Sequence, residues 1–257
     1  MMNAPKGPLN LQDVTVRRGG RIALDSVSTA FEPGTSTALV GPNGSGKTTL
    51  LEVLAGLLIP DSGQVVSPAT RVALVTQDHQ HRWLPLTVAE VVRMGRFDRS
   101  PLPRRLSAAD RAAVDDAVER LEVGDLLHRQ ISELSGGQRQ RALVAQALAR
   151  HAPLLLLDEP ITGLDLASQE RILEVVGQET EAGTTVVVTT HNLDEARDCD
   201  RVLVLDRRLV AEGTPDEVLT PSVLREAYGD RVLGDHAGHD HAHDLLIVDD
   251  HGHGSHA

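Results

Sequence analysis

The sequence predicts an α/β fold in which a largely parallel sheet is covered by helices. Short segments rich in β-branched residues alternate with segments of helical spacing, which is the pattern of parallel α/β domains. One segment, Leu154–Leu157, is a run of four leucines, as expected for a central strand that is covered on both faces. The predicted strands are Leu9–Val16, Ser36–Val40, Val72–Thr76, Leu154–Asp158, Thr185–Thr189 and Val202–Asp206.

The strand pattern disappears in the middle of the chain. Residues from about 84 to 150 contain three segments of helical spacing and a basic, proline-rich connection, Ser100–Arg105. The predicted helices are Thr87–Met94, Ala108–Leu121, for which Ser107 is a suitable N-cap, and Gln138–Arg150. We therefore predict one domain over residues 1–229, with a helical subdomain of about residues 84–150 inserted into it.

The composition restricts the class of protein. With 257 residues, of which 40% are apolar, the chain can bury the core of one domain. The net charge of -12 argues against a nucleic-acid partner. The single cysteine, Cys199, excludes internal disulfides and fits a reducing compartment. No run approaches the ~20 apolar residues of a membrane span, and the N-terminus lacks the apolar core of a signal peptide. We therefore expect any work at a membrane to be done through a partner.

A glycine-rich segment follows the predicted strand Ser36–Val40 and fits the pattern GxxxxGK[ST]. It consists of Gly41, Pro42, Asn43, Gly44, Ser45, Gly46, Lys47, Thr48 and Thr49. Glycines let backbone N–H groups surround phosphate oxygens, and a following helix presents its positive N-terminus to them. In this chemistry Lys47 bridges the β- and γ-phosphates of a nucleotide, and the Thr48 hydroxyl holds Mg²⁺. The alternative is a turn that matches by chance, against which the preceding strand and the two hydroxyls after the lysine argue.

Two carboxylates, Asp158 and Glu159, stand at the end of the predicted strand Leu154–Asp158. Open α/β sheets bind ligands at this edge. We expect Asp158 to orient Mg²⁺ through a water molecule and Glu159 to polarise the water that attacks the γ-phosphate. Alone, the pair is equally compatible with a solvated acidic turn, and the phosphate loop is what favours the functional interpretation.

A second anion-binding turn precedes the predicted helix Gln138–Arg150. Ser135, Gly136, Gly137 and Gln138 combine exposed N–H groups, a hydroxyl and a helix N-terminus. The sequence Leu134-Ser135-Gly136-Gly137-Gln138 resembles the signature of the ABC ATPase family, and the resemblance covers roughly Leu9–Ala227. It implies an ABC-type P-loop NTPase fold with an antiparallel N-terminal β subdomain. It also implies a homodimer in which each ATP, with Mg²⁺, lies between the phosphate loop of one chain and Ser135–Gln138 of the other.

Further family elements have counterparts in this sequence. The resemblance implies that Gln77 contacts the Mg²⁺ site and couples to the partner, and that His191 contacts the γ-phosphate. It places Asp165, of Gly163-Leu164-Asp165, at the dimer interface. The implied catalytic set is Glu159, His191, Lys47 and Gln77. One departure is Arg18, which stands where family members usually place an aromatic residue against adenine. A guanidinium can also stack on a purine, and selectivity for ATP over GTP stays open.

The resemblance also predicts the partners. One ATPase unit without a membrane span resembles bacterial importers, in which an integral membrane permease is a separate subunit. The runs Pro85–Val88, Met94–Phe97 and Glu159–Asp165 resemble the zinc and manganese uptake branch, although siderophore and haem importers share parts of them. We therefore expect an ATPase at the cytoplasmic face of the cell membrane that powers uptake of a transition metal, zinc first. An extracytoplasmic metal-binding protein is the expected third component.

The C-terminal segment, residues 230–257, differs in composition. It lacks apolar periodicity, and we expect it to be disordered without a ligand. Seven of the chain's twelve histidines lie here among aspartates, and these ligands suit Zn²⁺, with Ni²⁺, Cu²⁺ and Co²⁺ as competitors. They are His236, His239, His241, His243, His251, His253 and His256. A solvated tail without function is the alternative.

Two other classes of protein fit less well. A soluble ABC ATPase that remodels DNA or ribosomes resembles families with a long coiled-coil insertion or two ATPase units, and this chain has neither and is acidic. A non-catalytic regulatory subunit would be expected to lose Lys47, Glu159 or His191, and all three are present.

Overall fold

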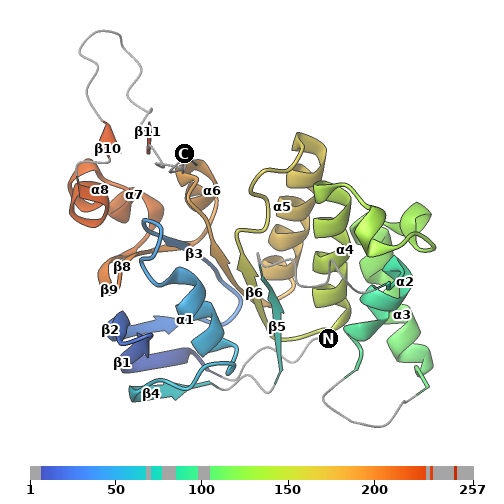
Figure 1. The fold of residues 1–257 in the computed structure, drawn as a ribbon, viewed down its shortest axis with the longest axis horizontal. Helices are drawn as coiled ribbons and strands as arrows, with labels where there is room; N and C mark the ends of the chain where they lie inside the picture. Colours follow the sequence, from blue (N-terminus) through green and yellow to red (C-terminus); the bar gives the residue numbers. More distant parts are fainter. Residues whose placement is uncertain are drawn as a thin grey trace, which may run out of the picture.

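A six-stranded sheet forms the centre of the computed structural model, which describes residues 7–67, 71–76, 85–97 and 105–229 and the backbone of 232–233 and 246–247. The strand order is β5-β6-β7-β3-β8-β9, and neighbouring strands are parallel except for β9, which is antiparallel to β8. The strands are β3 (Ser36–Val40), β5 (Val72–Val75), β6 (Leu154–Asp158), β7 (Thr185–Thr189), β8 (Arg201–Asp206) and β9 (Arg208–Gly213). The predicted α/β class is confirmed (Figure 1).

Both faces of this sheet are covered, as the leucine run indicates. Side chains alternate along a strand, so Leu155 and Leu157 of β6 join the core that contains apolar residues of α4 (Gly136–Ala149) and α5 (Leu166–Glu181). Leu154 and Leu156 join a second core, which contains residues of α1 (Lys47–Leu54) and of the N-terminal strands. Each fully buried leucine contributes about 2 kcal/mol of hydrophobic stabilisation, and these two cores therefore hold β6 in the middle of the fold.

The N-terminal strands form a separate antiparallel sheet with the order β2-β1-β4. The strands are β1 (Leu9–Arg18), β2 (Arg21–Phe31) and β4 (Ser62–Val66), and only the first is among the predicted strands. The pairing of β1 with β2 contains register shifts, and Asp13 and Ser26 have positive φ angles of 49° and 50°. These irregularities interrupt the alternation of apolar and polar residues on which strand prediction depends. The antiparallel N-terminal subdomain itself is confirmed.

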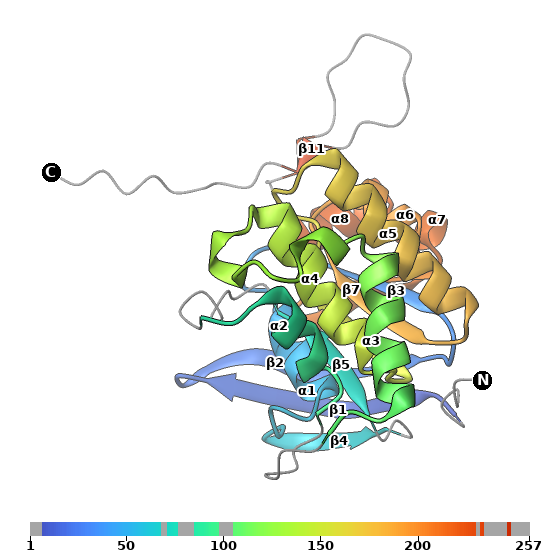
Figure 2. The same cartoon turned by 90° about the vertical axis from the view of Figure 1, so that its right-hand side faces the viewer.

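The described part of the region between β5 and β6 is helical, as predicted. It consists of α2 (Val88–Met94), α3 (Ala108–Arg120), 3₁₀ turns at Gly124–Leu126 and Ile131–Glu133, and α4. Figure 2 shows α2, α3 and α4 side by side in front of the sheet. Ser107 is the N-cap of α3, and its side chain accepts a hydrogen bond from Asp110 N, which confirms that prediction. α4 begins two residues earlier than predicted because Ser135 acts as its N-cap.

The C-terminal part adds α6 (Leu193–Arg197), α7 (Pro215–Val218) and α8 (Pro221–Tyr228). Two short strands, β10 (Val232–Leu233) and β11 (Leu246–Ile247), pair antiparallel beyond α8. This pairing lies within segment 230–257, for which disorder without a ligand is expected, and its four residues are aliphatic, with a strand propensity that His and Asp lack. The seven histidines of this segment lie outside the described residues.

Candidate active site

The glycine-rich loop between β3 and α1 is shaped by close backbone contacts. A Cβ atom on Gly41 would stand 2.1 Å from the carbonyl oxygen of Leu205, and one on Gly46 would stand 2.6 Å from that of Ala23. Gly46 also has a φ angle of 104°, which an L side chain rarely adopts. Glycine is therefore required at both positions, and the loop delivers the N-terminus of α1 to the edge of the sheet where anions bind.

The tip of the β8–β9 hairpin is hydrogen-bonded to this loop. Arg207 N donates a hydrogen bond to Ser45 O at 2.7 Å, and Asp25 N donates one to Arg207 O, also at 2.7 Å. Arg207 has a φ angle of 59°, in the left-handed region, which these two hydrogen bonds hold in place. The main chain thus links β2 through the hairpin to the phosphate loop.

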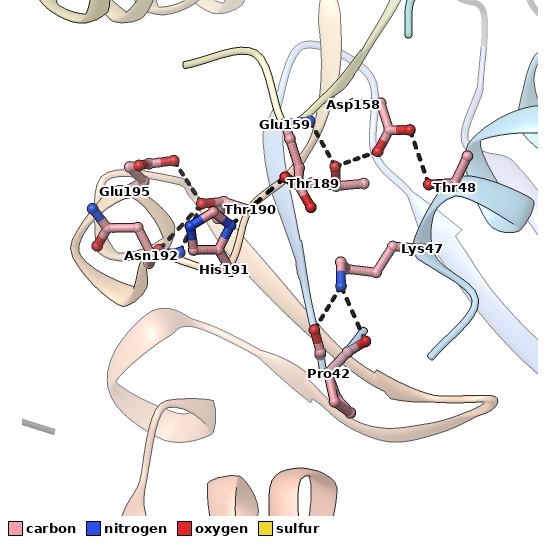
Figure 3. Close-up of polar contacts among 11 residues, drawn as sticks. Pro42, Lys47, Thr48, Asp158, Glu159, Thr189, Thr190, His191, Asn192 and Glu195 are labelled. Atoms are coloured by element: carbon pink, nitrogen blue, oxygen red, sulfur yellow. Dashed lines mark hydrogen bonds and ion pairs between the residues drawn. The ribbon is translucent and has the colours of Figure 1, made fainter. Parts of the chain in front are cut away.

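Lys47 lies inside the loop and is only 7% exposed. Its Nζ donates hydrogen bonds to Gly41 O at 2.6 Å and to Pro42 O at 3.2 Å (Figure 3). The ammonium is therefore held at the backbone of the loop whose N–H groups would bind phosphate oxygens. A hollow of about 310 Å³ opens here, and it is lined by Ala23, Asn43, Gly44, Ser45, Gly46, Lys47, Thr48, Thr49 and Glu159.

Asp158, at the end of β6, is 3% exposed and is hydrogen-bonded through both carboxylate oxygens. Thr48 Oγ1 donates to Asp158 Oδ2 at 2.9 Å, and Thr189 Oγ1 donates to Asp158 Oδ1 at 2.7 Å (Figure 3). The hydroxyl of Thr48 and the carboxylate of Asp158 are hard oxygen ligands of the kind Mg²⁺ prefers. The structure thus brings together two of the three predicted Mg²⁺ ligands, and the third, Gln77, lies outside the described residues.

Glu159 follows Asp158 and lines the hollow beside Lys47. Its φ angle is 47°, unusual for a residue with a side chain, and its N–H donates to Thr189 Oγ1 at 2.9 Å. His191 follows β7, the strand next to β6, and its Nδ1 lies 3.7 Å from Glu159 Oε2. The carboxyl ends of adjacent strands therefore place an acid, an imidazole and the phosphate loop around one space (Figure 3).

The Ser135–Gln138 turn is also built as expected for the N-terminus of a helix. Ser135 Oγ accepts from Gln138 N at 3.3 Å, and Gln138 Oε1 accepts from Ser135 N at 3.2 Å. Asp165 caps α5, where Ser168 N and Ser168 Oγ donate to its two oxygens at 3.0 and 2.9 Å. The hydrogen bond from Ser168 N, followed by that from the hydroxyl, lowers the pKa of Asp165. Asp165 therefore carries a structural role within its own chain.

The turn and the loop do not meet within one chain. Among the described residues, those that line the hollow come from the loop, α1 and β2, together with Glu159, and none comes from 135–138. Arg18, predicted to lie against the nucleobase, forms an ion pair with Glu52 of α1, the helix that follows the loop. Across the described ranges no group of three or more His, Cys, Asp or Glu side chains could hold a metal ion.

Sequence reasoning missed several residues of the site. Thr189 hydrogen-bonds both members of the acidic pair, Thr190 and Glu195 lie beside His191, and Ala23 lines the hollow. The threonines could have been found, because two polar residues at the carboxyl end of a buried strand occupy the edge where ligands bind. Nothing local in the sequence identifies Ala23 or Glu195, which approach the site only through tertiary packing.

Similarity to known proteins agrees with this geometry. The family described as ABC transporter matches residues 24–162, more than half of the chain and a segment that contains the loop, the turn and the acidic pair. The chain belongs to the ABC transporter family. It is an ATPase of the kind that serves as the ATP-binding subunit of such transporters, and it uses Mg²⁺ with its nucleotide.

The relatives include transporters of metal ions. The manganese transport system ATP-binding protein MntA of Synechocystis sp. is 38% identical over 220 residues, covering 81% of this chain and 85% of the relative. The zinc import ATP-binding protein ZnuC of Paramagnetospirillum magneticum is 36% identical over 250 residues, covering 96% and 90%. Among solved structures, a proposed metal-chelate type ABC transporter in an inward-facing conformation matches with a TM-score of 0.77 at 28% identity, covering 86% of this chain and 88% of that one. A dimeric bacterial ABC transporter cassette matches with a TM-score of 0.71 at 29% identity, covering 80% and 98%.

Proposed function

We propose that this ATPase powers a membrane importer for a transition-metal ion, with zinc as the first candidate. The observation that carries the proposal is the similarity, over most of the chain, to ATP-binding proteins named for manganese transport and zinc import. Of these two relatives, the manganese transport protein has the higher identity, so manganese is the main alternative ion. Iron-siderophore and haem transport are further alternatives, and the relatives also include a chelated-iron transport protein at 37% identity and a cobalamin import protein at 39%.

The side chains around the hollow support a mechanism of ATP hydrolysis. Lys47 and the loop N–H groups would bind the β- and γ-phosphates of ATP, and Thr48 and Asp158 would hold Mg²⁺. Bound Mg²⁺ supplies charge neutralisation at the phosphate oxygens. Glu159 would accept the proton of the attacking water, because its carboxylate faces the same space. His191 would stabilise the γ-phosphate from the neighbouring strand.

The geometry supports a second copy of the chain as the first partner. The hollow described above contains one anion site, and the Ser135–Gln138 turn is a second one that does not reach it. Ser135 and Gly136 are exposed, so the turn is accessible to another molecule. A head-to-tail homodimer would place each turn on the partner's bound ATP, an arrangement with twofold symmetry. The dimeric cassette among the similar structures supports this arrangement.

The second partner would be a membrane permease that holds the ATPase at the cytoplasmic face of the membrane. None of the described helices combines the length and the hydropathy of a membrane span. A hollow of about 420 Å³ opens between β5 and α4, and three apolar residues that line it, Leu57, Met94 and Phe97, are exposed by 60%, 38% and 42%. Exposed apolar residues around a hollow are typical of a docking surface. We propose that the permease docks here, and that an extracytoplasmic protein delivers the ion to it.

The identity of the transported ion is tested most directly in cells. The chain would be deleted in its own host and replaced by the wild type or by Lys47→Ala, and cellular zinc, manganese and iron would be measured by mass spectrometry under metal limitation. A zinc deficit that only the wild type restores supports zinc import. A deficit confined to manganese or iron replaces zinc by that ion, and unchanged contents of all three metals would remove metal import altogether.

The C-terminal histidines are a separate part of the proposal. We propose that they bind Zn²⁺ weakly and at several sites, since imidazole and carboxylate are its common ligands. Isothermal titration of Zn²⁺, Mn²⁺, Ni²⁺ and Fe²⁺ into the full chain and into a chain ending at Gly234 tests this. Micromolar-range Zn²⁺ binding should be lost on truncation, and equal binding by both chains would contradict it.

A further inference from the structure

A third carboxylate, Glu195 of α6, lies next to the pair formed by Glu159 and His191 (Figure 3). Its Oε2 accepts a hydrogen bond from Thr190 Oγ1 at 2.6 Å. Burial raises the pKa of Glu195, while the hydrogen bond from Thr190 and the charge of His191 act in the opposite direction. The mechanism above has no role for this group, although even a partly buried carboxylate is unfavourable unless it is hydrogen-bonded or paired with a charge.

The partner of Glu195, Thr190, is 2% exposed and is held at three points. Its N–H donates to Leu39 O of β3 at 3.1 Å, which ties it to the strand that leads into the phosphate loop. Its hydroxyl donates to Glu195 and accepts a hydrogen bond from Asn192 N at 2.9 Å. The residues on both sides of His191 are therefore fixed by one hydroxyl group.

The same network starts α6. Asn192 Oδ1 accepts from Asp194 N at 2.9 Å and so caps the helix that carries Glu195. The turn Thr190–Asn192 and α6 are therefore linked by three hydrogen bonds. The Thr190 hydroxyl accepts from Asn192 N, the Asn192 side chain caps α6, and Glu195 of α6 accepts from the Thr190 hydroxyl. A charged acceptor makes the hydrogen bond from Thr190 stronger than a neutral one would.

We propose that Glu195 is a positioning residue for ATP hydrolysis: through Thr190 it holds the turn that presents the imidazole of His191 to Glu159. The distance of 3.7 Å between His191 Nδ1 and Glu159 Oε2 depends on this turn, since the His191 side chain itself is 41% exposed. Loss of the network leaves the phosphate loop intact and displaces the imidazole. This role rests on the functions proposed above for Glu159 and His191.

The test uses the full chain and steady-state ATP hydrolysis. Thr190→Val and Glu195→Ala should lower kcat between about 10- and 100-fold, as expected for a displaced group in an active site, while KM for MgATP changes less than about twofold. Thr190→Ser retains the hydroxyl and should keep most of the activity. Thr180→Val on α5 and Glu226→Gln on the surface are matched controls, which should behave as the wild type.

A double-mutant cycle separates positioning from a general effect on the fold. If Glu195 acts through His191, then adding Glu195→Ala to His191→Ala should lower kcat no further. Full additivity of the two losses would overturn the proposal, as would normal kcat in Thr190→Val. If His191→Ala and Glu159→Gln themselves retain normal kcat, the failure lies in the proposed mechanism and not in the network alone. If Glu195→Ala unfolds, Glu195→Gln takes its place in the test. Glutamine keeps the shape of the glutamate side chain, so this variant should lose less activity than Glu195→Ala.

Discussion

Gly137 lies so close to Asp165 that a Cβ atom on the glycine would stand 2.5 Å from Asp165 Oδ2. Ser168 Oγ would be nearer still, at 2.4 Å. The turn at the start of α4 therefore packs directly on the capped N-terminus of α5. Asp165, predicted from the family resemblance to lie at a dimer interface, has this contact within its own chain whatever it meets in a partner.

Gly137→Ala should lower ATP hydrolysis by at least about tenfold, because the methyl group must displace Asp165 or Ser168 and with them the turn. Nucleotide affinity at the phosphate loop should stay unchanged, as measured by titration with a fluorescent ATP analogue. Gly177→Ala is the matched control, since nothing lies within 4 Å of the position that its methyl group would take on α5. It should retain activity and stabilise the fold by about 0.5–1 kcal/mol. Normal turnover in Gly137→Ala would show that the turn tolerates displacement.

Arg18→Ala should weaken ATP binding if the guanidinium stacks on the nucleobase. Its ion pair with Glu52 holds the side chain near α1, and both partners are partly exposed, so thermal stability should hardly change. Equilibrium binding of ATP and GTP measures the effect. Arg21→Ala, at the paired position across the β1–β2 hairpin, is the control. Unchanged affinity in Arg18→Ala would place the base elsewhere.

Arg96→Met should lower the free energy of unfolding by about 3 kcal/mol. Arg96 donates to Asp110 at 3.0 Å and to Ala149 O at 2.8 Å, which joins the ends of α2 and α4 to the start of α3. The side chains of Arg96 and Asp110 are only 17% and 3% exposed, so the substitution removes a charge-assisted hydrogen bond from a carboxylate that stays buried. Urea unfolding followed by circular dichroism gives the difference.

The surface pair Arg208–Glu226 provides the comparison for that measurement, with side chains 67% and 56% exposed. Arg208→Met should change stability by less than about 1 kcal/mol. Equal effects of the two substitutions would mean that burial adds nothing to the Arg96 pair.

Glu195→Gln should raise stability at neutral pH while it lowers activity. Burial puts the folded pKa of Glu195 above the unfolded value of about 4.3, and the charge of Glu159 acts in the same direction, whereas the hydrogen bond from Thr190 and the charge of His191 act against it. The ionised carboxylate therefore opposes folding: the penalty is absent below pH ~4 and grows as the pH rises through the folded pKa. The stability advantage of the variant should follow the same course in urea unfolding at several pH values. A stability difference between Glu195→Gln and the wild type that did not change with pH would contradict a raised pKa of Glu195 in the folded state.

Local patterns were enough to predict much of the site. The loop Gly41–Thr49, the acids after β6 and the turn at Ser135 each combine residue type with a strand end or a helix start, and the structure places all three on such elements. The strands β2, β4 and β9 were not predicted, nor were the two-residue strands β10 and β11. A bulge at Ser26, an exposed glycine-containing strand and a hairpin joined by the single residue Arg207 interrupt the alternation that sequence reading relies on.

By itself, the sequence determined the chemistry of this protein: the α/β class, the phosphate loop, the acidic pair and the helical insert, because each depends on neighbours in the chain. The tertiary structure decided which of these groups meet. Parallel pairing of β6, β7 and β3 sets Asp158, Glu159, Thr189 and His191 around Lys47, although the chain separates them by up to about 150 residues. It also leaves the Ser135 turn away from the loop of its own chain and brings Glu195 to Thr190. Contacts of this kind arise from the order of strands in a sheet and the packing of helices on it, which no local pattern encodes.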